Sequence, residues 1–359
     1  MSFLDSKRIV GTNLERVGGT TDTIPSGGVG GWKELGRTTL GSNGDTISVA
    51  SLSDKRYYMW LVDTTATGGN VELKTRANND TGSNYSFRYS SNGGADTAQT
   101  GYPHSGLGYY DALGSGESGF TVGYTANLSS KEKLTIGHHV SNKSGTGAAT
   151  APDSVETAGK WANASNALNR IDYYNDDAGD FASGSEMVVL EYDPNDTHTD
   201  NFWEELSSVT TTSSGTISSG TITAKKYLMY QIIGKKASGS GTGSPRFQFN
   251  GDTGSNYAQR NGINGTHYTY GNQSSANIGG DGNTAGEMAM FTGFIINEAS
   301  KEKLFLGFSA FGNTAGAGSI GNRGEIFDKW TNTSNQITSI ECMGTTFEAG
   351  AKMTIWGSD

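Results

Sequence analysis

The chain has few of the residues that cross-link a protein or carry it across a membrane. Among its 359 residues is one cysteine, Cys342, so a framework of intrachain disulfides is excluded. No run of about 18 apolar residues occurs, so no transmembrane helix is expected. The opening residues, MSFLDSKRIVG, lack the apolar core of a signal peptide. We therefore expect neither a signal peptide nor a place in a membrane.

Charge and catalytic motifs are equally sparse. The 26 Lys and Arg stand against 36 Asp and Glu, a formal net charge of −10, so nucleic acid is not an expected partner. His138 and His139 are adjacent, and on a strand they would point to opposite faces rather than hold one metal ion. No G-x-S-x-G nucleophile motif occurs. The sequence predicts no catalytic residue, no cofactor and no metal.

What the chain has is glycine and aromatic residues. It contains 53 Gly, 16 Tyr, 14 Phe and 6 Trp, but only 5 Pro. Glycine and asparagine supply the positive φ angles of tight turns, and aromatic side chains pack well on pleated sheets. This composition favours an all-β protein with many turns.

The sequence is also duplicated. The word DTGSNY occurs at 80–85 and at 252–257, and SKEKL occurs at 130–134 and at 300–304. Further pairs, such as Trp161 and Trp330, recur in the same order at offsets of about 170 residues. Recurrence in one order at one spacing indicates a tandem duplication of a single domain.

Each copy reads as a series of short strands. Alternating or β-branched runs are separated by Gly, Asn and Ser clusters, which gives eight or nine strands per copy. Because no sustained helical periodicity intervenes, the strands are expected to pair antiparallel, closing into a jelly-roll-like β-sandwich; a seven-stranded immunoglobulin-like sandwich is the alternative. The best short helix candidate is KWANASNAL (160–168).

The predicted organisation has four parts. An extended N-terminal arm (1–30) has no counterpart in the second copy and is predicted to anchor the chain, with a disordered terminus as the alternative. The first sandwich spans 31–193, a linker spans 194–201, and the second sandwich spans 202–359.

The repeated words favour structural roles. DTGSNY is predicted to be a turn whose Asp binds backbone amides, with a carbohydrate or calcium loop as the alternative. SKEKL is predicted to be a polar turn that blunts a sheet edge or marks a loop tip. The acidic residues Asp172, Asp176, Asp177 and Asp180 leave a calcium site open, although a solvated loop is favoured.

Two divergent segments are candidates for recognition. Both segments combine tyrosines, expected to be exposed, with glycine, which is the composition of adaptable binding loops: YPHSGLGYY (102–110) and HYTYGNQ (267–273). The candidate recognition residues are Tyr102, Tyr109, Tyr110, Tyr268 and Tyr270.

The DTGSNY-like turn, the SKEKL-like turn and the strand sequence SEMVVL together resemble virion structural proteins of tailed bacteriophages, especially marine and cyanobacterial ones. These are capsid-decoration, head-fibre or tail-fibre proteins, and the resemblance covers residues 32–359. It implies β-sandwich modules attached to a particle, and it transfers no catalytic residue. The anchoring residues expected in the arm are Phe3, Leu4, Arg8, Ile9, Val10 and Leu14.

These observations predict a non-enzymatic virion protein, made in the host cytoplasm and attached to a capsid through its arm. The expected partners are the major capsid protein or another virion protein, and further copies of the chain, with a trimer favoured. The alternatives are a tail-fibre or receptor-binding module that recognises a cell-surface glycan, and a double jelly-roll capsid subunit. A polysaccharide-degrading enzyme would need a pair of carboxylates in one groove.

Overall fold

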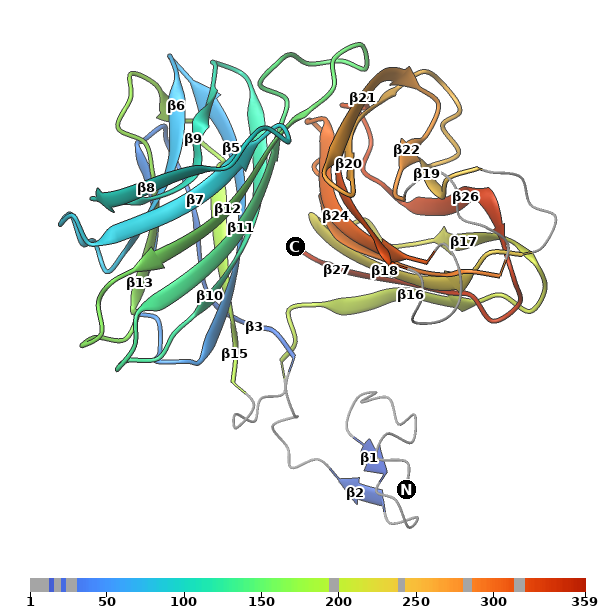
Figure 1. Ribbon diagram of the computed structural model, residues 1–359, viewed down its shortest axis with the longest axis horizontal. Helices are drawn as coiled ribbons and strands as arrows, with labels where there is room; N and C mark the ends of the chain where they lie inside the picture. Colours follow the sequence, from blue (N-terminus) through green and yellow to red (C-terminus); the bar gives the residue numbers. More distant parts are fainter. Residues whose placement is uncertain are drawn as a thin grey trace.

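The computed structural model describes residues 31–193, 200–237, 243–279, 286–312 and 320–359, and the backbone alone at 13–15, 21–23 and 107–111. Every regular element in these residues is a β-strand, and all the strand pairs are antiparallel (Figure 1). The all-β class predicted from composition is therefore confirmed.

The first sandwich contains two sheets. The large sheet has the order β3-β15-β5-β10-β11-β12-β7-β8, with β14 paired to β5, and the small sheet has the order β4-β13-β6-β9. Its strands are β3 (Lys33–Thr39), β4 (Thr46–Ala50), β5 (Tyr57–Thr67), β6 (Val71–Ala77), β7 (Tyr85–Ser91), β8 (Thr97–Tyr102), β9 (Ser105–Leu113), β10 (Ser118–Ala126), β11 (Lys133–Ser141), β12 (Asp153–Trp161), β13 (Arg170–Tyr174), β14 (Asp180–Phe181) and β15 (Glu186–Tyr192).

The second sandwich repeats this topology. Its large sheet has the order β16-β27-β18-β23-β24-β25-β20-β21, and its small sheet has the order β17-β26-β19-β22. Its strands are β16 (Glu204–Thr210), β17 (Gly215–Thr221), β18 (Tyr227–Lys235), β19 (Arg246–Phe249), β20 (Tyr257–Ile263), β21 (Thr266–Gln273), β22 (Ala276–Asn277), β23 (Met288–Ile296), β24 (Lys303–Phe311), β25 (Asn322–Trp330), β26 (Ser339–Phe347) and β27 (Lys352–Ser358). Apart from β14, each strand of one copy has its counterpart at the same place in the other, which shows two homologous sandwiches.

Each sandwich has its own core between its two sheets. Trp60, Tyr58 and Tyr173 are among the buried residues of the first core, and Trp330 and Tyr230 are among those of the second. Alternation along the strands puts these side chains on the inner faces of the large sheets, except for Tyr173, which lies on the inner face of the small sheet.

Two details differ from the sequence prediction. The first copy has sheets of nine and four strands, and the described part of the second has sheets of eight and four, rather than eight or nine strands per copy. Strands such as β8 and β9 in the first copy and β21 in the second form where loops were expected. The prediction of a helix at 160–168 is wrong. β12 ends at Trp161, and the Asn163 side chain then accepts hydrogen bonds from the amides of Ser165 and Asn166, both at 2.9 Å. Such a side-chain turn competes with helix formation.

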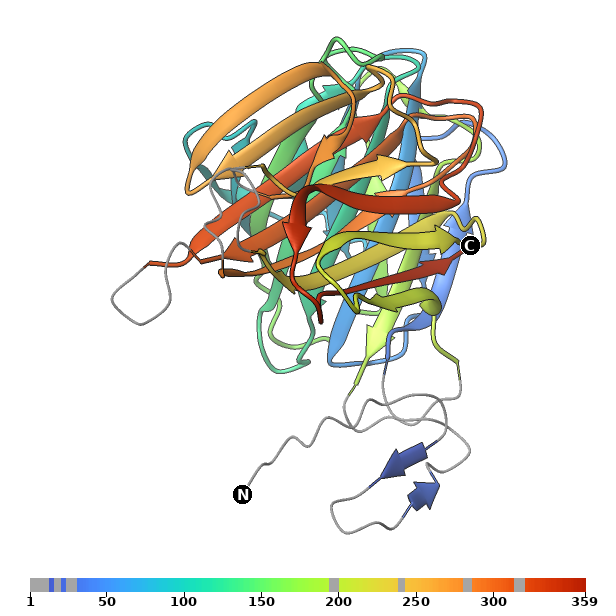
Figure 2. The same cartoon turned by 90° about the vertical axis from the view of Figure 1, so that its right-hand side faces the viewer.

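The two sandwiches pack through their large sheets, and the small sheets lie on the outside (Figure 1). Seen from the side, the strands of the two large sheets cross (Figure 2). β24 lies against β10 and β11. The chain therefore forms four layers, and its middle contact joins the duplicated halves.

In the predicted arm, β1 (Asn13–Glu15) pairs with β2 (Thr21–Thr23). Leu14 lies in β1 opposite Asp22. The other predicted anchoring residues lie outside the described part of the chain: Phe3, Leu4, Arg8, Ile9 and Val10.

Candidate interaction faces on the large sheets

The first DTGSNY word is a turn bonded to a core tryptophan. The Asp80 carboxylate accepts hydrogen bonds from the Gly82 amide at 2.8 Å and from Trp161 Nε1 at 2.7 Å. The Tyr85 hydroxyl donates back to the Asp80 carbonyl at 3.1 Å. Burial alone would raise the pKa of Asp80, but the bonds from Trp161, Asn84 and Gly82 lower it.

The second word repeats these bonds. Asp252 accepts from the Gly254 amide at 2.9 Å and from Trp330 Nε1 at 2.7 Å, and the Tyr257 hydroxyl donates to the Asp252 carbonyl at 3.2 Å. The carboxylate oxygens are thus engaged within the fold. The duplicated word is a structural turn that connects the small sheet to the large sheet and binds a buried tryptophan.

The SKEKL word is the polar turn before a strand that was predicted, but it does not blunt a sheet edge. Its second lysine, Lys133 or Lys303, is buried, and each ammonium donates to three backbone carbonyls. The strands that follow, β11 and β24, are central in their sheets rather than edges. The edge-blunting role is therefore wrong, because the lysine ties two loops together inside the sandwich.

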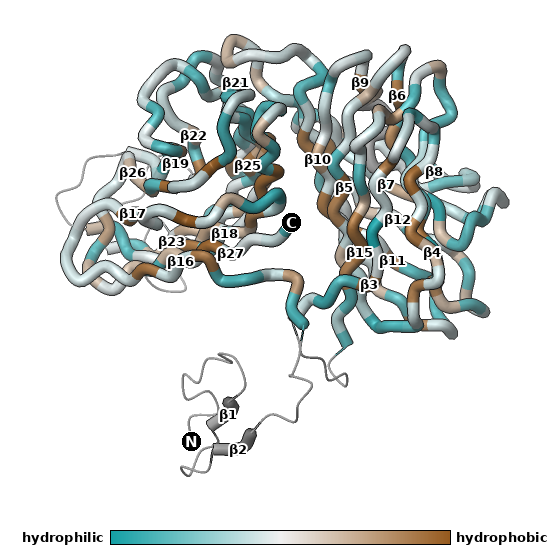
Figure 3. Tube along the Cα trace, turned by 180° about the vertical axis from the view of Figure 1, so that it is seen from behind, coloured by the Kyte–Doolittle hydropathy of each residue, from teal (hydrophilic) through white to brown (hydrophobic). Residues whose placement is uncertain are grey.

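An apolar cluster joins the two sandwiches. It lies on the outer faces of the large sheets, meaning the faces that point away from each sheet's own core. Apolar residues line these two faces where the large sheets meet (Figure 3). The first sandwich contributes Met59, Leu61, Phe120, Val122, Val140, Val188 and Leu190. The second contributes Phe202, Tyr227, Phe294, Ile296, Leu304, Leu306 and Phe327. Both faces of each large sheet are therefore apolar in this region, one for its own core and one for the other half.

Buried charges fix the position of this contact. Asp63 of the first sandwich is 1% exposed and meets Lys301 at 2.9 Å and Lys226 at 3.4 Å. Lys226 also meets Glu186 at 3.2 Å and Glu298 at 3.0 Å. Burial alone would lower the pKa of Lys226, but Asp63, Glu298 and Glu186 raise it to about 12. Ion pairs that are correct only in one arrangement favour that arrangement over others.

A loop of the first sandwich is gripped by the second. Lys329 Nζ donates to the Gly145 carbonyl at 2.7 Å, and Arg260 Nε donates to the Pro152 carbonyl at 2.6 Å. Glu302 accepts from the Asn142 side chain at 3.1 Å and pairs with Lys329 at 3.4 Å. The outer face of β20, β24 and β25 therefore holds the loop at 142–152 through its backbone.

Some large apolar side chains on the same outer faces stay exposed. On the first sandwich these are Tyr57 (40%), Leu134 (57%) and Ile136 (55%). On the second they are Ile233 (46%), Met288 (52%) and Met290 (41%). The sequence prediction missed these two strips; the available signal was strands such as KRYYMWLVD, apolar at both odd and even positions. Contiguous exposed apolar residues mark interaction surfaces.

The strip on the first sandwich borders a shallow groove. The groove has a volume of about 340 Å³ and lies over β7, β8, β11 and β12. Small residues, Ser86, Ala98 and Ala158, line it together with Leu134, Arg88 and Lys160. Glu132 pairs with Lys160 at 3.2 Å beside it.

The predicted recognition tyrosines lie on three strands, two in the first sandwich and one in the second. Tyr102 ends β8 and packs on Phe87 and His104, with ring centroids 5.6 and 5.4 Å apart. Tyr109 and Tyr110 lie in β9, and their side chains are outside the described part. Tyr268 and Tyr270 are exposed on β21 of the other sandwich. The segments are strands rather than the loops expected from their glycine content.

The four acidic residues of the candidate calcium site have different partners. Asp172 is buried and accepts from Arg170 Nε at 2.6 Å, and Asp176 pairs with Lys74. Asp177 accepts from the next backbone amide, and Asp180 begins β14. Within the described ranges, no group of three or more His, Cys, Asp or Glu side chains is placed to hold a metal ion.

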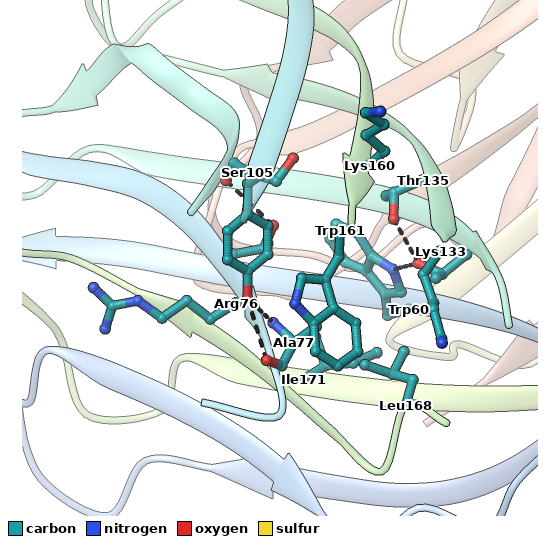
Figure 4. A pocket seen from close by; sticks show the side chains of 13 residues that line it. Trp60, Arg76, Ala77, Ser105, Lys133, Thr135, Lys160, Trp161, Leu168 and Ile171 are labelled. Atoms are coloured by element: carbon teal, nitrogen blue, oxygen red, sulfur yellow. Dashed lines mark hydrogen bonds between the residues drawn. The ribbon is translucent and has the colours of Figure 1, made fainter. Parts of the chain in front are cut away.

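A small cavity lies inside the first sandwich, between Trp60, Trp161 and Tyr85 (Figure 4). Trp60 Nε1 donates to Thr125, which is also bonded to Thr135. The volume of about 40 Å³ holds roughly one to three waters, whereas ligand pockets usually measure about 300–1,000 Å³. The cavity is too small for a sugar ring.

The second sandwich fills the same space with aromatic rings. Strand register makes Ala77 equivalent to Phe249 and Thr135 equivalent to Phe305. The Phe249 ring lies 5.6 Å from Phe305 and 5.7 Å from Trp330, and both phenylalanines are fully buried. The two cores have therefore diverged at one corner of an otherwise common fold.

Comparisons with known proteins give no family for the chain. No family model and no curated protein matches it. Among solved structures, domains LG4-5 of the mouse laminin alpha1 chain show 6% identity, 90% coverage of each chain and a TM-score of 0.21. The attachment invasion locus protein Ail of Yersinia pestis shows 5% identity, coverage of 77% and 99%, and a TM-score of 0.14. Neisserial surface protein A shows 6% identity, coverage of 80% and 96%, and a TM-score of 0.15. These scores are too low to carry a conclusion about fold or function.

No helix with the length and apolar character of a membrane span occurs in the residues that the structure describes.

Proposed function

We propose that the chain is a non-enzymatic structural protein of a virion, a decoration or head-fibre protein attached to the capsid through residues 1–30. Its partners are the major capsid protein or another virion protein, and further copies of the chain, with a trimer favoured. The virion assignment rests on the resemblance of the repeated turns and the SEMVVL strand to phage structural proteins.

One structural observation supports an assembly role. The duplicated sandwiches are joined into one body through an apolar sheet face, and apolar residues of the same faces, including Tyr57, Ile136 and Met290, remain exposed beside that contact. A protein that works by being held in a larger structure needs such a surface. The bonds of the duplicated Asp and Lys residues support a durable scaffold.

The test is a truncation. A chain beginning at residue 31 should keep the near- and far-ultraviolet circular dichroism of the full chain, and should no longer co-sediment with particles assembled by the phage that encodes it. The full chain, purified in the same way, is the control. Co-sedimentation of the truncated chain at the level of the full chain would rule out attachment through the leading segment.

A glycan-recognising module is the second candidate. It is favoured by Tyr268 and Tyr270, which are exposed on the edge strand β21. A glycan array probed with the full chain and with a Tyr268→Ala/Tyr270→Ala variant tests it. Binding that the double substitution removes would favour this candidate, and an array without signal would exclude it for the sugars present.

A further inference from the structure

The contact between the two sandwiches is heterologous, because it uses different parts of the same homologous sheet. The second sandwich uses a surface formed by Tyr227, Leu304 and Leu306, all of which are buried. We call this surface, with the loop-holding residues Arg260, Lys329 and Glu302, the gripping face. The first sandwich instead presents Asp63, Phe120 and Val140 together with the loop at 142–152, which we call the receiving face.

The first sandwich retains an unused gripping face. Strand register makes Tyr57, Leu134 and Ile136 the counterparts of Tyr227, Leu304 and Leu306. These three counterparts are the exposed strip described above. Apolar character has therefore been kept at positions that the described residues leave 40–57% exposed.

The polar residues of the gripping face are retained too. Arg88, Lys160 and Glu132 of the first sandwich stand at the positions of Arg260, Lys329 and Glu302. The Glu132–Lys160 pair, at 3.2 Å, reproduces the Glu302–Lys329 pair, at 3.4 Å. In the second sandwich these side chains hold a Gly- and Ala-rich loop; in the first they border the open groove.

The second sandwich likewise retains an unused receiving face. Ile233 and Met290 stand at the positions of Asp63 and Phe120, and both are exposed. In its described residues, each chain thus carries one free gripping face and, around Ile233 and Met290, one free receiving face.

We propose that the free gripping face of one chain binds the free receiving face of a second copy, so that the contact inside the chain is repeated between chains. A heterologous contact of this kind produces a closed ring or an open filament. The inference rests on the structural role proposed above and names the surface through which that role operates.

The contact between chains differs from the internal one in charge. The acids Asp63 and Glu186 of the internal contact are replaced by Ile233 and Lys352, while Arg56 and Lys131 stand where Lys226 and Lys301 bind those acids. The contact between copies is therefore apolar, with like charges at one side. Added salt screens that repulsion, so association should strengthen as ionic strength rises.

Sedimentation velocity of the purified full chain, without particles, tests the proposal. The wild type should form oligomers whose size grows with concentration. Ile136→Asp damages the gripping face and Met290→Asp damages the receiving face, so each should weaken self-association by about tenfold or more. Thr221→Asp changes an exposed residue at the end of β17, on the small sheet and away from both faces, and is the control.

Mixing the two damaged variants makes the test specific. Each still has one intact face, so an equimolar mixture should form dimers that neither variant forms alone. A wild type that stays monomeric at every concentration, or an Met290→Asp variant that still associates while Ile136→Asp does not, would overturn the heterologous contact. Circular dichroism of each variant checks folding. Because no particle is present, failure here leaves the truncation test of particle attachment unaffected.

Discussion

At the scale of single residues, the duplicated words are explained by what they hold. Asp80 and Asp252 each bind a backbone amide and a tryptophan Nε1 in the same geometry. A turn residue that also satisfies a buried indole cannot change without leaving a polar group unpaired. The words have therefore stayed the same where neighbouring loops diverged.

Asp252→Ala should lower the free energy of unfolding by about 1–3 kcal/mol, because Trp330 Nε1 and the Gly254 amide lose their acceptor. Asp80→Ala should cost a similar amount through Trp161. Chemical denaturation monitored by tryptophan fluorescence measures both. Asp96→Ala, an exposed control, should change stability by less than about 0.5 kcal/mol, and equal effects at all three positions would contradict this explanation.

The diverged core corner gives a second prediction. Phe249→Ala should destabilise the protein by about 3–5 kcal/mol, since it empties a position packed between Phe305 and Trp330. In the first sandwich Ala77 stands there, beside the smaller Thr135, and a small cavity occupies this corner. Differential scanning calorimetry would show the loss, and a change below about 1 kcal/mol would mean that this corner is not tightly packed.

The sequence predicts the roles of some of these residues but not of others. It indicates that DTGSNY forms a turn, because Asp and Gly have local preferences. It does not indicate that Lys133 and Lys303 are buried, since their carbonyl acceptors at Asn163 and Asn332 come from loops about thirty residues away. Charge alone places a lysine at the surface, and only the tertiary fold supplies acceptors inside.

At the scale of elements, buried charges should make the contact between sandwiches sensitive to acid. Burial alone would raise the pKa of Glu298, but Lys301 and Lys226 lower it to about 2, from an ordinary value of 4.5. Because the folded pKa is depressed, Glu298 adds stability above about pH 4.5, and this contribution is lost as the pH falls toward 2.

Unfolding free energies of wild type and Glu298→Gln, measured across that range, check the prediction. The difference between them should shrink as the pH falls. Asp63 titrates in the opposite sense, since burial raises its pKa, and because it interacts with Glu298 the same comparison is repeated in an Asp63→Asn background. A difference that stays constant from pH 5 to about pH 2 would contradict the role of Glu298.

A charge exchange tests the specificity of the same contact. Asp63→Lys should destabilise the protein by about 3 kcal/mol or more, since it places a third cation beside Lys226 and Lys301. Adding Lys301→Asp should recover part of that loss, measured by a double-mutant cycle. Strictly additive effects would show that the two residues do not interact.

Strands were predictable from alternation, but the contacts of their second faces were not. In β5, Trp60 and Val62 face the core of their own sandwich, while Met59 and Leu61 face the other sandwich. A strand whose residues are apolar on both faces is expected to be buried on both sides, but its sequence does not say what covers the second face. That depends on how two sheets from distant parts of the chain pack together.

At the scale of the whole molecule, duplication explains both the fold and its remaining surfaces. Two homologous sheets meet through non-equivalent faces, so one gripping face and one receiving face stay unused. The sequence predicted the duplication and the sandwich class from repeated words and composition. It could not predict the unused faces, because an exposed Ile136 and a buried Leu306 look alike in sequence.

The most direct test of this account is a cryo-electron microscopy map of the full chain in its assembled state. The account predicts that Tyr57, Leu134 and Ile136 of each copy are covered by the second sandwich of its neighbour, around Ile233 and Met290. A map in which these strips face solvent, or in which first sandwiches meet only one another, would contradict it.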